Sequence, residues 1–138
     1  MSISPSQCTV FVQVWVDVNG LAQGSTRGCY AVSNRSQNSS GQGTANLTTT
    51  VITGSNVCWA VLPIDPQYNG DFTITAIGVE SGWASPPMPV PDQPNVFTGQ
   101  VAQSTVGGNI NSNIQFSYNG GGSAITITLP VTIVPVTA

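Results

Sequence analysis

The chain has 138 residues, which fits a single domain over residues 1–138 that buries about two-thirds of the surface its unfolded form exposes. Charged residues make up only 5% of the sequence, and because lysine and histidine are absent, the only cations are Arg27 and Arg35. Such a chain cannot neutralise a row of phosphates, which excludes nucleic acids and anionic membranes as partners.

The acidic residues offer no catalytic arrangement. They are scattered along the chain at Asp17, Asp65, Asp71, Glu80 and Asp92. General acid–base and nucleophilic catalysis mostly rely on histidine or on paired carboxylates, and any triad that includes histidine is impossible in this sequence. We therefore expect that the protein is not an enzyme.

The first residues do not resemble a signal peptide, because no basic residue precedes an apolar run. The longest apolar stretches of the sequence are also far too short to span a bilayer. We therefore expect a protein that is cytoplasmic as synthesised, or extracellular if a leader has been removed.

The clearest element is a strand over residues 9–18. Valines occupy its even positions from Val10 to Val18, so one face of the strand is fully apolar. The opposite face carries Phe11, Gln13 and Trp15, although a solvated face should hold few aromatic side chains. We expect another copy of the protein to cover this second face, with Phe11, Gln13 and Trp15 at the self-association interface.

Seven more strands follow in chain order. They are predicted over residues 28–33, 44–53, 56–64, 71–79, 95–103, 110–118 and 125–133. Gly, Asn and Pro separate them, and no window shows helical periodicity. The predicted fold class is therefore all-β, an antiparallel β-sandwich of about eight strands with a jelly-roll or immunoglobulin-like architecture. Pro130 lies inside the last strand, which predicts an edge position or a bulge there.

Residues 80–94 are predicted to be irregular. Prolines stand at positions 86, 87, 89, 91 and 94, and each removes a backbone donor and restricts the residue before it. We expect an extended, polyproline-like loop, with Trp83 packed against it or exposed.

Residues 65–71 concentrate oxygen ligands in one loop. Asp65 and Asp71 supply carboxylates, which calcium prefers, although the spacing matches no EF-hand and a plain turn is the simpler interpretation. Tyr68 and Trp83 offer flat faces on which a sugar can stack, and Asn69 offers an amide for hydrogen bonds. The alternative to self-association is therefore a carbohydrate-binding module or lectin that binds a glycan, with calcium as its one possible cofactor.

The three cysteines, Cys8, Cys29 and Cys58, show no CxxC spacing, and the chain has no histidine to complete a zinc site. Small, buried cysteine side chains are the simplest interpretation. One disulfide with one remaining free thiol is the alternative, because each cysteine lies in or beside a predicted strand.

Several short motifs resemble the AidA/PixA family of bacterial inclusion-body proteins. They are the Gly-Gln-Gly entry and strand at 40–47, the return strand and turn at 51–59, the opening Val-Trp-Val-Asp at 14–17 and the late strand at 114–116. The sequence departs from that family at Asn56, where the family has Asp, and at residues 125–133, which replace an aromatic-rich C-terminal strand.

The resemblance implies a small, non-enzymatic β-sandwich that accumulates in the bacterial cytoplasm and assembles with itself. The low charge and the aromatic second face of the first strand favour self-association independently. We therefore expect a non-enzymatic, self-associating structural protein that forms a homo-oligomer or a larger assembly and needs no cofactor.

Overall fold

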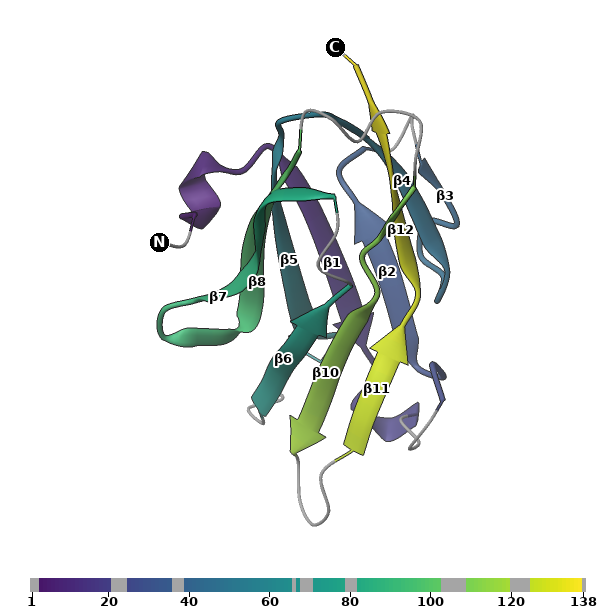
Figure 1. The fold of residues 1–138 in the computed structure, drawn as a ribbon. Helices are drawn as coiled ribbons and strands as arrows, with labels where there is room; N and C mark the ends of the chain where they lie inside the picture. The colour runs from purple at the N-terminus through teal and green to yellow at the C-terminus, as the bar shows by residue number, and fades with distance from the viewer. Residues whose placement is uncertain are drawn as a thin grey trace.

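The computed structural model describes residues 3–20, 25–35, 39–65, 67, 71–78, 82–102, 109–119 and 125–137. These residues form twelve strands and two short 3-10 turns, η1 (Pro5–Gln7) and η2 (Val18–Gly20) (Figure 1). The strands are β1 (Val10–Val16), β2 (Cys29–Ser33), β3 (Ser39–Ser40), β4 (Leu47–Ile52), β5 (Asn56–Pro63), β6 (Asp71–Ile77), β7 (Trp83–Val90), β8 (Gln93–Val101), β9 (Ile110–Asn111), β10 (Ile114–Asn119), β11 (Ile125–Leu129) and β12 (Val131–Val136). Within the described ranges, no helix has the length and apolar character of a membrane span.

The strands form three sheets. The largest has the order β2-β1-β5-β8-β7, a second has the order β3-β4-β12-β9, and a third has the order β11-β10-β6. Figure 1 shows the three-stranded sheet in front of β1 and β5, with β4 and β12 beside it. The five-stranded sheet is therefore one layer of a sandwich, and the two smaller sheets form the opposite layer.

One main hydrophobic core lies between these layers. Its members come from all three sheets and include Val12, Val14, Trp59, Leu47, Ile133, Phe72, Phe116 and Leu129. The core accounts for the alternating apolar residues of the sequence, because a strand that packs against a core on one side buries every second side chain.

Strand β1 lies inside the five-stranded sheet, between β2 and β5. Its even-numbered valines from Val10 to Val16 are almost completely buried, and the odd-numbered residues between them are half-buried. The predicted two-faced strand is therefore confirmed over Val10–Val16, whereas Val18, expected on its apolar face, lies in η2. β-branched side chains suit this position, because they pack well on a pleated, buried surface.

The all-β sandwich is confirmed, but two of its three sheets are mixed. Strand β1 runs parallel to β5, and β12 runs parallel to β4, whereas the sequence pattern predicted antiparallel neighbours. Alternation shows which side of a strand is buried, and it is the same in parallel and antiparallel pairs, so it cannot give the direction of a neighbour. The described strands also number twelve instead of about eight, partly because β3 and β9 have only two residues each.

The prediction of an irregular segment over residues 80–94 is wrong for most of its length. Strand β7 pairs antiparallel with β8, with register shifts along the ladder, and it forms the edge of the five-stranded sheet. An edge strand tolerates proline, because its outward backbone groups need no partner in the sheet. The β7–β8 hairpin turns at Pro91 and Asp92, and Asp92 has a positive φ of 65°.

The predicted strand over residues 125–133 is two strands in two different sheets. Strand β11 ends at Leu129 beside β10, and β12 begins at Val131 beside β4. Pro130 stands between them, outside both ladders. The sequence predicted an edge position or a bulge at Pro130, whereas the structure ends one strand before this proline and begins another after it. Pro130 therefore carries the chain from one sheet to the next.

We predict that Val14→Ala lowers the free energy of unfolding by about 2 kcal/mol, because Val14 is fully buried at the centre of the sheet. Gln13→Ala, one residue away on the opposite face, should change it by less than about 0.5 kcal/mol. Denaturant titration of dilute protein measures both values, and equal losses for the two variants would contradict the assigned faces of β1.

Candidate functional site: the outer face of the five-stranded sheet

The five-stranded sheet has an outer face that points away from the main core. Tyr30, Trp15 and Leu62 lie side by side on it, because Trp15 pairs with Tyr30 of β2 and with Leu62 of β5. Tyr30 is 43% exposed, and Trp15 and Leu62 are half-buried. We call these three residues the outer row. It presents two aromatic rings and an aliphatic side chain to solvent.

The next positions along the same strands continue this apolar character. Gln13 pairs with Val32 of β2 and with Ala60 of β5, and all three side chains are half-buried. Two residues before Gln13, Phe11 packs against a small cluster separate from the main core, and Ile3 from the N-terminal segment packs against the same cluster. The outer face is therefore covered near Phe11 and open at the outer row.

The sequence-predicted residues Phe11, Gln13 and Trp15 do share this face, with Phe11 in its covered part. Their role in self-association stays a prediction. Sequence reasoning missed Tyr30 and Leu62, although both follow the alternation of their own strands. Only the register of β2 and β5 against β1 shows that they flank Trp15.

One edge of the five-stranded sheet is sealed by residues of the chain itself. The Ala31 N–H donates to the carbonyl of Thr44 at 2.9 Å, and the Gly43 N–H donates to the carbonyl of Ala31 at 2.7 Å. The Gln42 side chain mimics a strand beside Ser33: its Oε1 accepts from the Ser33 N–H at 2.8 Å, and its Nε2 donates to the Ser33 carbonyl at 2.9 Å. These backbone groups of β2 are therefore not free to pair with another chain.

The other edge of the sheet is strand β7. Pro86, Pro87 and Pro89 lack a backbone N–H, so this edge has few donors for an added strand. Both edges of the five-stranded sheet thus oppose edge-to-edge pairing, whereas the outer row leaves part of its outer face open to solvent.

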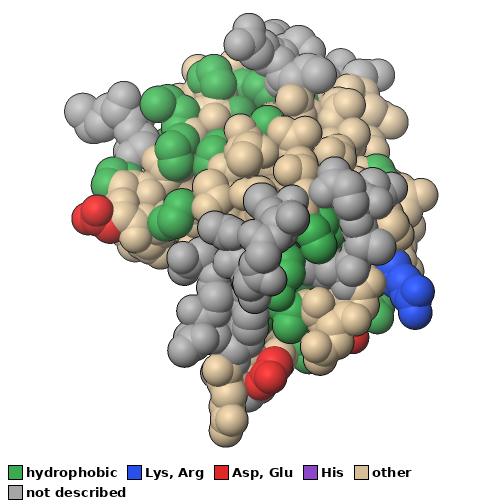
Figure 2. Space-filling view, turned by 90° about the horizontal axis from the view of Figure 1, so that it is seen from below, with side chains coloured by type: hydrophobic (Ala, Val, Ile, Leu, Met, Phe, Trp, Pro, Cys, Tyr) green, Lys and Arg blue, Asp and Glu red, His purple; other side chains and the backbone are tan. Residues whose placement is uncertain are grey.

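Charge is sparse on the molecular surface. In Figure 2 the acidic and basic side chains on the face in view are few and far apart, among hydrophobic and neutral polar surface. The N–H of Asn19 donates to the Asp17 carboxylate at 3.1 Å, just beyond the end of β1. Repulsion between copies of such a surface is weak, because Coulomb forces between a few exposed charges are screened by salt.

A groove of about 260 Å³ lies between β6 and the β7–β8 hairpin. Its lining is mostly apolar and contains no charged side chain: Thr75, Ala76, Ile77, Gly78, Pro86, Pro87 and Phe97. The Thr75 hydroxyl already bonds to the backbone and side chain of Gln115. The groove offers no group for acid–base or nucleophilic chemistry, and it is smaller than typical ligand sites of about 300–1,000 Å³.

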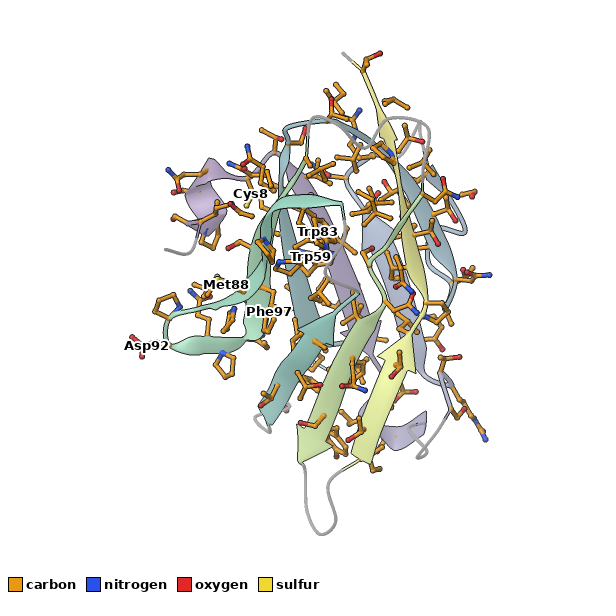
Figure 3. The ribbon with its side chains drawn as sticks, in the orientation of Figure 1. Cys8, Trp59, Trp83, Met88, Asp92 and Phe97 are labelled. Atoms are coloured by element: carbon orange, nitrogen blue, oxygen red, sulfur yellow. The ribbon has the colours of Figure 1, made fainter. Side chains whose placement is uncertain are left out.

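Trp83 is half-buried and packs against the core. Its ring meets the ring of Trp59 edge to face, with the ring centroids 5.5 Å apart and the planes at 81° (Figure 3). The indole N–H of the fully buried Trp59 is the one side-chain group among the described residues that is buried without a hydrogen-bond partner. The contact with Trp59 covers part of the Trp83 ring, so less of the ring surface is exposed for a sugar to stack on.

The loop expected to bind calcium is only partly described. Tyr68 and Asn69 lie outside the described residues, and Asp71 begins β6. Asp65 is exposed, and its carboxylate accepts a hydrogen bond from the Gln67 N–H at 2.9 Å, as in an ordinary turn. Among the described residues, no three His, Cys, Asp or Glu side chains lie close enough to hold a metal ion.

All three cysteines are buried thiols. Burial raises the pKa of Cys29 to about 11, and Cys29 lies in the main core. Cys8 and Cys58 lie together in the small cluster on the outer face. Burial raises the pKa of Cys58 to about 11 as well, with further contributions from Cys8, and it also raises the pKa of Cys8.

The mixed five-stranded sheet facing two smaller sheets defines the class of the protein as an all-β sandwich domain. A solved structure of this class is the inclusion body protein PixA from Burkholderia cenocepacia J2315, with a TM-score of 0.66. The two chains are only 10% identical, and the match covers 99% of this chain and 100% of that chain. The resemblance to the AidA/PixA family is therefore confirmed at the level of the fold.

The chain belongs to the family described as Domain of unknown function (DUF8788), whose sequence model matches residues 8–124. The match includes the strands that carry the outer row, β1, β2 and β5. Comparison with curated proteins gives no significant match.

We predict that the raised pKa of Cys29 makes the fold less stable in alkali. The folded pKa of about 11 exceeds the ordinary value of 9.0, so stability is intact below about pH 9 and falls as the pH rises toward 11. Denaturant midpoints measured across this range should fall less steeply for Cys29→Ala than for the wild type, after normalisation at pH 7. Equal slopes would show that Cys29 is not the buried thiol described above.

Proposed function

We propose that this protein is a non-enzymatic structural protein that assembles with copies of itself through the outer faces of its five-stranded sheets. The observation that carries the proposal is the outer row of Tyr30, Trp15 and Leu62, which forms one continuous apolar strip across three neighbouring strands. Two such strips brought together by a two-fold axis would bury aromatic surface on both copies, as a symmetric interface requires.

Three further observations support assembly in which the outer face of one copy contacts the outer face of another. The two edges of the five-stranded sheet are sealed at β2 and rich in proline at β7. The surface carries too little charge to keep copies apart. The protein of similar fold is described as an inclusion body protein, and an inclusion body is a deposit of many protein copies. We carry over from it only self-association and accumulation in the bacterial cytoplasm.

Light scattering over a dilution series tests this proposal. We expect the wild type to form species larger than a monomer, and Tyr30→Ser and Trp15→Gln to raise the concentration needed for assembly about tenfold or more, because aromatic anchors dominate interface energies. Tyr30 is the cleaner position, because its exposed ring contributes less to folding than the half-buried ring of Trp15.

Met88→Ser is the matched control for Tyr30→Ser. Met88 is 47% exposed, close to the 43% of Tyr30, and it lies on the edge strand β7, which β8 separates from the three strands of the outer row. Its substitution should leave assembly within about twofold of the wild type. A wild type that stays monomeric at all concentrations rejects self-association, and equal effects of the two variants reject the outer row as its interface.

Calcium and sugars separate this function from the lectin alternative. We predict that neither changes the thermal midpoint by more than about 1 °C, because assembly requires no such ligand. A lectin at a ligand concentration of a hundred times Kd would gain about 2.7 kcal/mol, which is several degrees for a domain of this size. Differential scanning calorimetry with a panel of monosaccharides, with and without calcium, measures the shift, and a rise of several degrees would favour the lectin.

A further inference from the structure

Two cysteines that are far apart in the sequence meet on the outer face of the five-stranded sheet. Cys8 and Cys58 are 8% and 6% exposed, and with Val90 and Val96 they form a small hydrophobic cluster separate from the main core. Cys58 and Cys8 lie close enough to shift each other's pKa, and the Cys8 thiol donates to the carbonyl of Ser4 at 3.8 Å. The two thiols therefore lie together inside a shielded cluster. Figure 3 shows Cys8 beside the N-terminal turn, close to the upper part of the five-stranded sheet.

Hydrogen bonds hold Cys8 in this position from both sides along the chain. The Thr9 N–H donates to the carbonyl of Asn56 at 3.1 Å, and the Asn56 side chain donates to the carbonyl of Gln7 at 3.0 Å. Further toward the N-terminus, the Thr98 hydroxyl donates to the carbonyl of Ile3 at 2.6 Å. The position of Cys8 beside Cys58 is therefore fixed by hydrogen bonds between the N-terminal segment and the sheet.

Cys29 lies on the opposite face of the same sheet. It pairs with Val16 on the core side, whereas Cys58 pairs with Phe11 on the outer side. A bond between Cys29 and either of the other two cysteines would have to pass through the sheet. Of the three possible disulfide pairings of these cysteines, the fold therefore allows only the one between Cys8 and Cys58.

We propose that Cys8 and Cys58 are a redox-active pair that forms an intramolecular disulfide on exposure to a peroxide, while Cys29 remains a thiol. This inference does not depend on the proposed function. The bond would join the N-terminal segment to β5 covalently and so fix the cover over the Phe11 end of the outer face.

The chemistry balances with hydrogen peroxide as the oxidant. The Cys8 thiolate attacks one peroxide oxygen, the O–O bond breaks, and Cys8 becomes a sulfenic acid while the leaving hydroxide takes a proton to give water. The Cys58 thiolate then attacks the Cys8 sulfur, so that the S–S bond forms, the S–O bond breaks and the leaving hydroxide takes a proton to give a second water. The two thiols lose two electrons in total, and the peroxide is reduced to two waters.

The environment of the pair decides which thiol reacts first and how fast. Burial raises the pKa of both thiols, but the neighbouring Cys58 opposes this rise at Cys8, so Cys8 ionises more readily and is the first nucleophile. Little thiolate exists at neutral pH, so the reaction is slow there. A small oxidant such as hydrogen peroxide suits two thiols that are almost fully buried.

The positions of the two arginines make the test direct. Trypsin cleaves only after Arg27 and Arg35 in this chain, which has no lysine, so Cys8, Cys29 and Cys58 fall in separate peptides, 1–27, 28–35 and 36–138. Full-length folded protein at high dilution is treated with hydrogen peroxide, its remaining thiols are alkylated in denaturant, and the digest is analysed by mass spectrometry without reduction. We expect peptide 1–27 joined to peptide 36–138, and peptide 28–35 alkylated.

Single cysteine variants complete the experiment. Cys29→Ser is the matched control and should give the same joined peptides, whereas Cys8→Ser should give none. A higher denaturant midpoint after oxidation, reversed by dithiothreitol, confirms that the bond forms in the folded protein, since it restricts the unfolded chain. The proposal is overturned if peptide 28–35 is joined to either partner, if the bond links two chains, or if Cys8 is oxidised to the sulfonic acid without any cross-link.

Discussion

The parallel pairing of β1 with β5 is the constraint on which the rest of the structure depends. It aligns the buried valines of β1 with Val57, Trp59 and Val61, which builds one wall of the core. The same register aligns Phe11 with Cys58 and Trp15 with Leu62 on the other side. Core and outer face are thus two consequences of a single alignment, because successive side chains of a strand point to opposite sides.

A parallel pair cannot be joined by a tight turn, and this explains the course of the intervening chain. Residues 17–55 leave the sheet after β1, return as β2 on its other side, and form β3 and β4 in the opposite layer before entering β5. On that route, residues 42–44 run beside β2 and bond its outer edge. The crossover that makes the parallel pair possible therefore also closes one edge of the sheet.

The alternation of apolar residues was sufficient to predict the fold class, most strand positions and the two faces of β1. It was not sufficient for strand direction or sheet membership, which depend on contacts between residues far apart in the sequence. Strand β7 was missed because proline disrupts a central strand but is tolerated at an edge, and the sequence alone does not show which strand is at an edge. At the candidate site, the side of β1 that carries Trp15 was predictable, whereas its neighbours Tyr30 and Leu62 required the register.

The passage of the chain through Pro130 has a consequence for synthesis on the ribosome. Strand β12 lies between β4 and β9 in the four-stranded sheet, and its register joins Val131 to Leu47. That sheet is incomplete until residues 131–136 have left the ribosomal exit tunnel, so one backbone edge of β4 has no partner while the remaining chain is translated. This layer of the sandwich must therefore close after translation of residue 136, and the nascent chain is exposed to association with its neighbours on the same messenger RNA until it does.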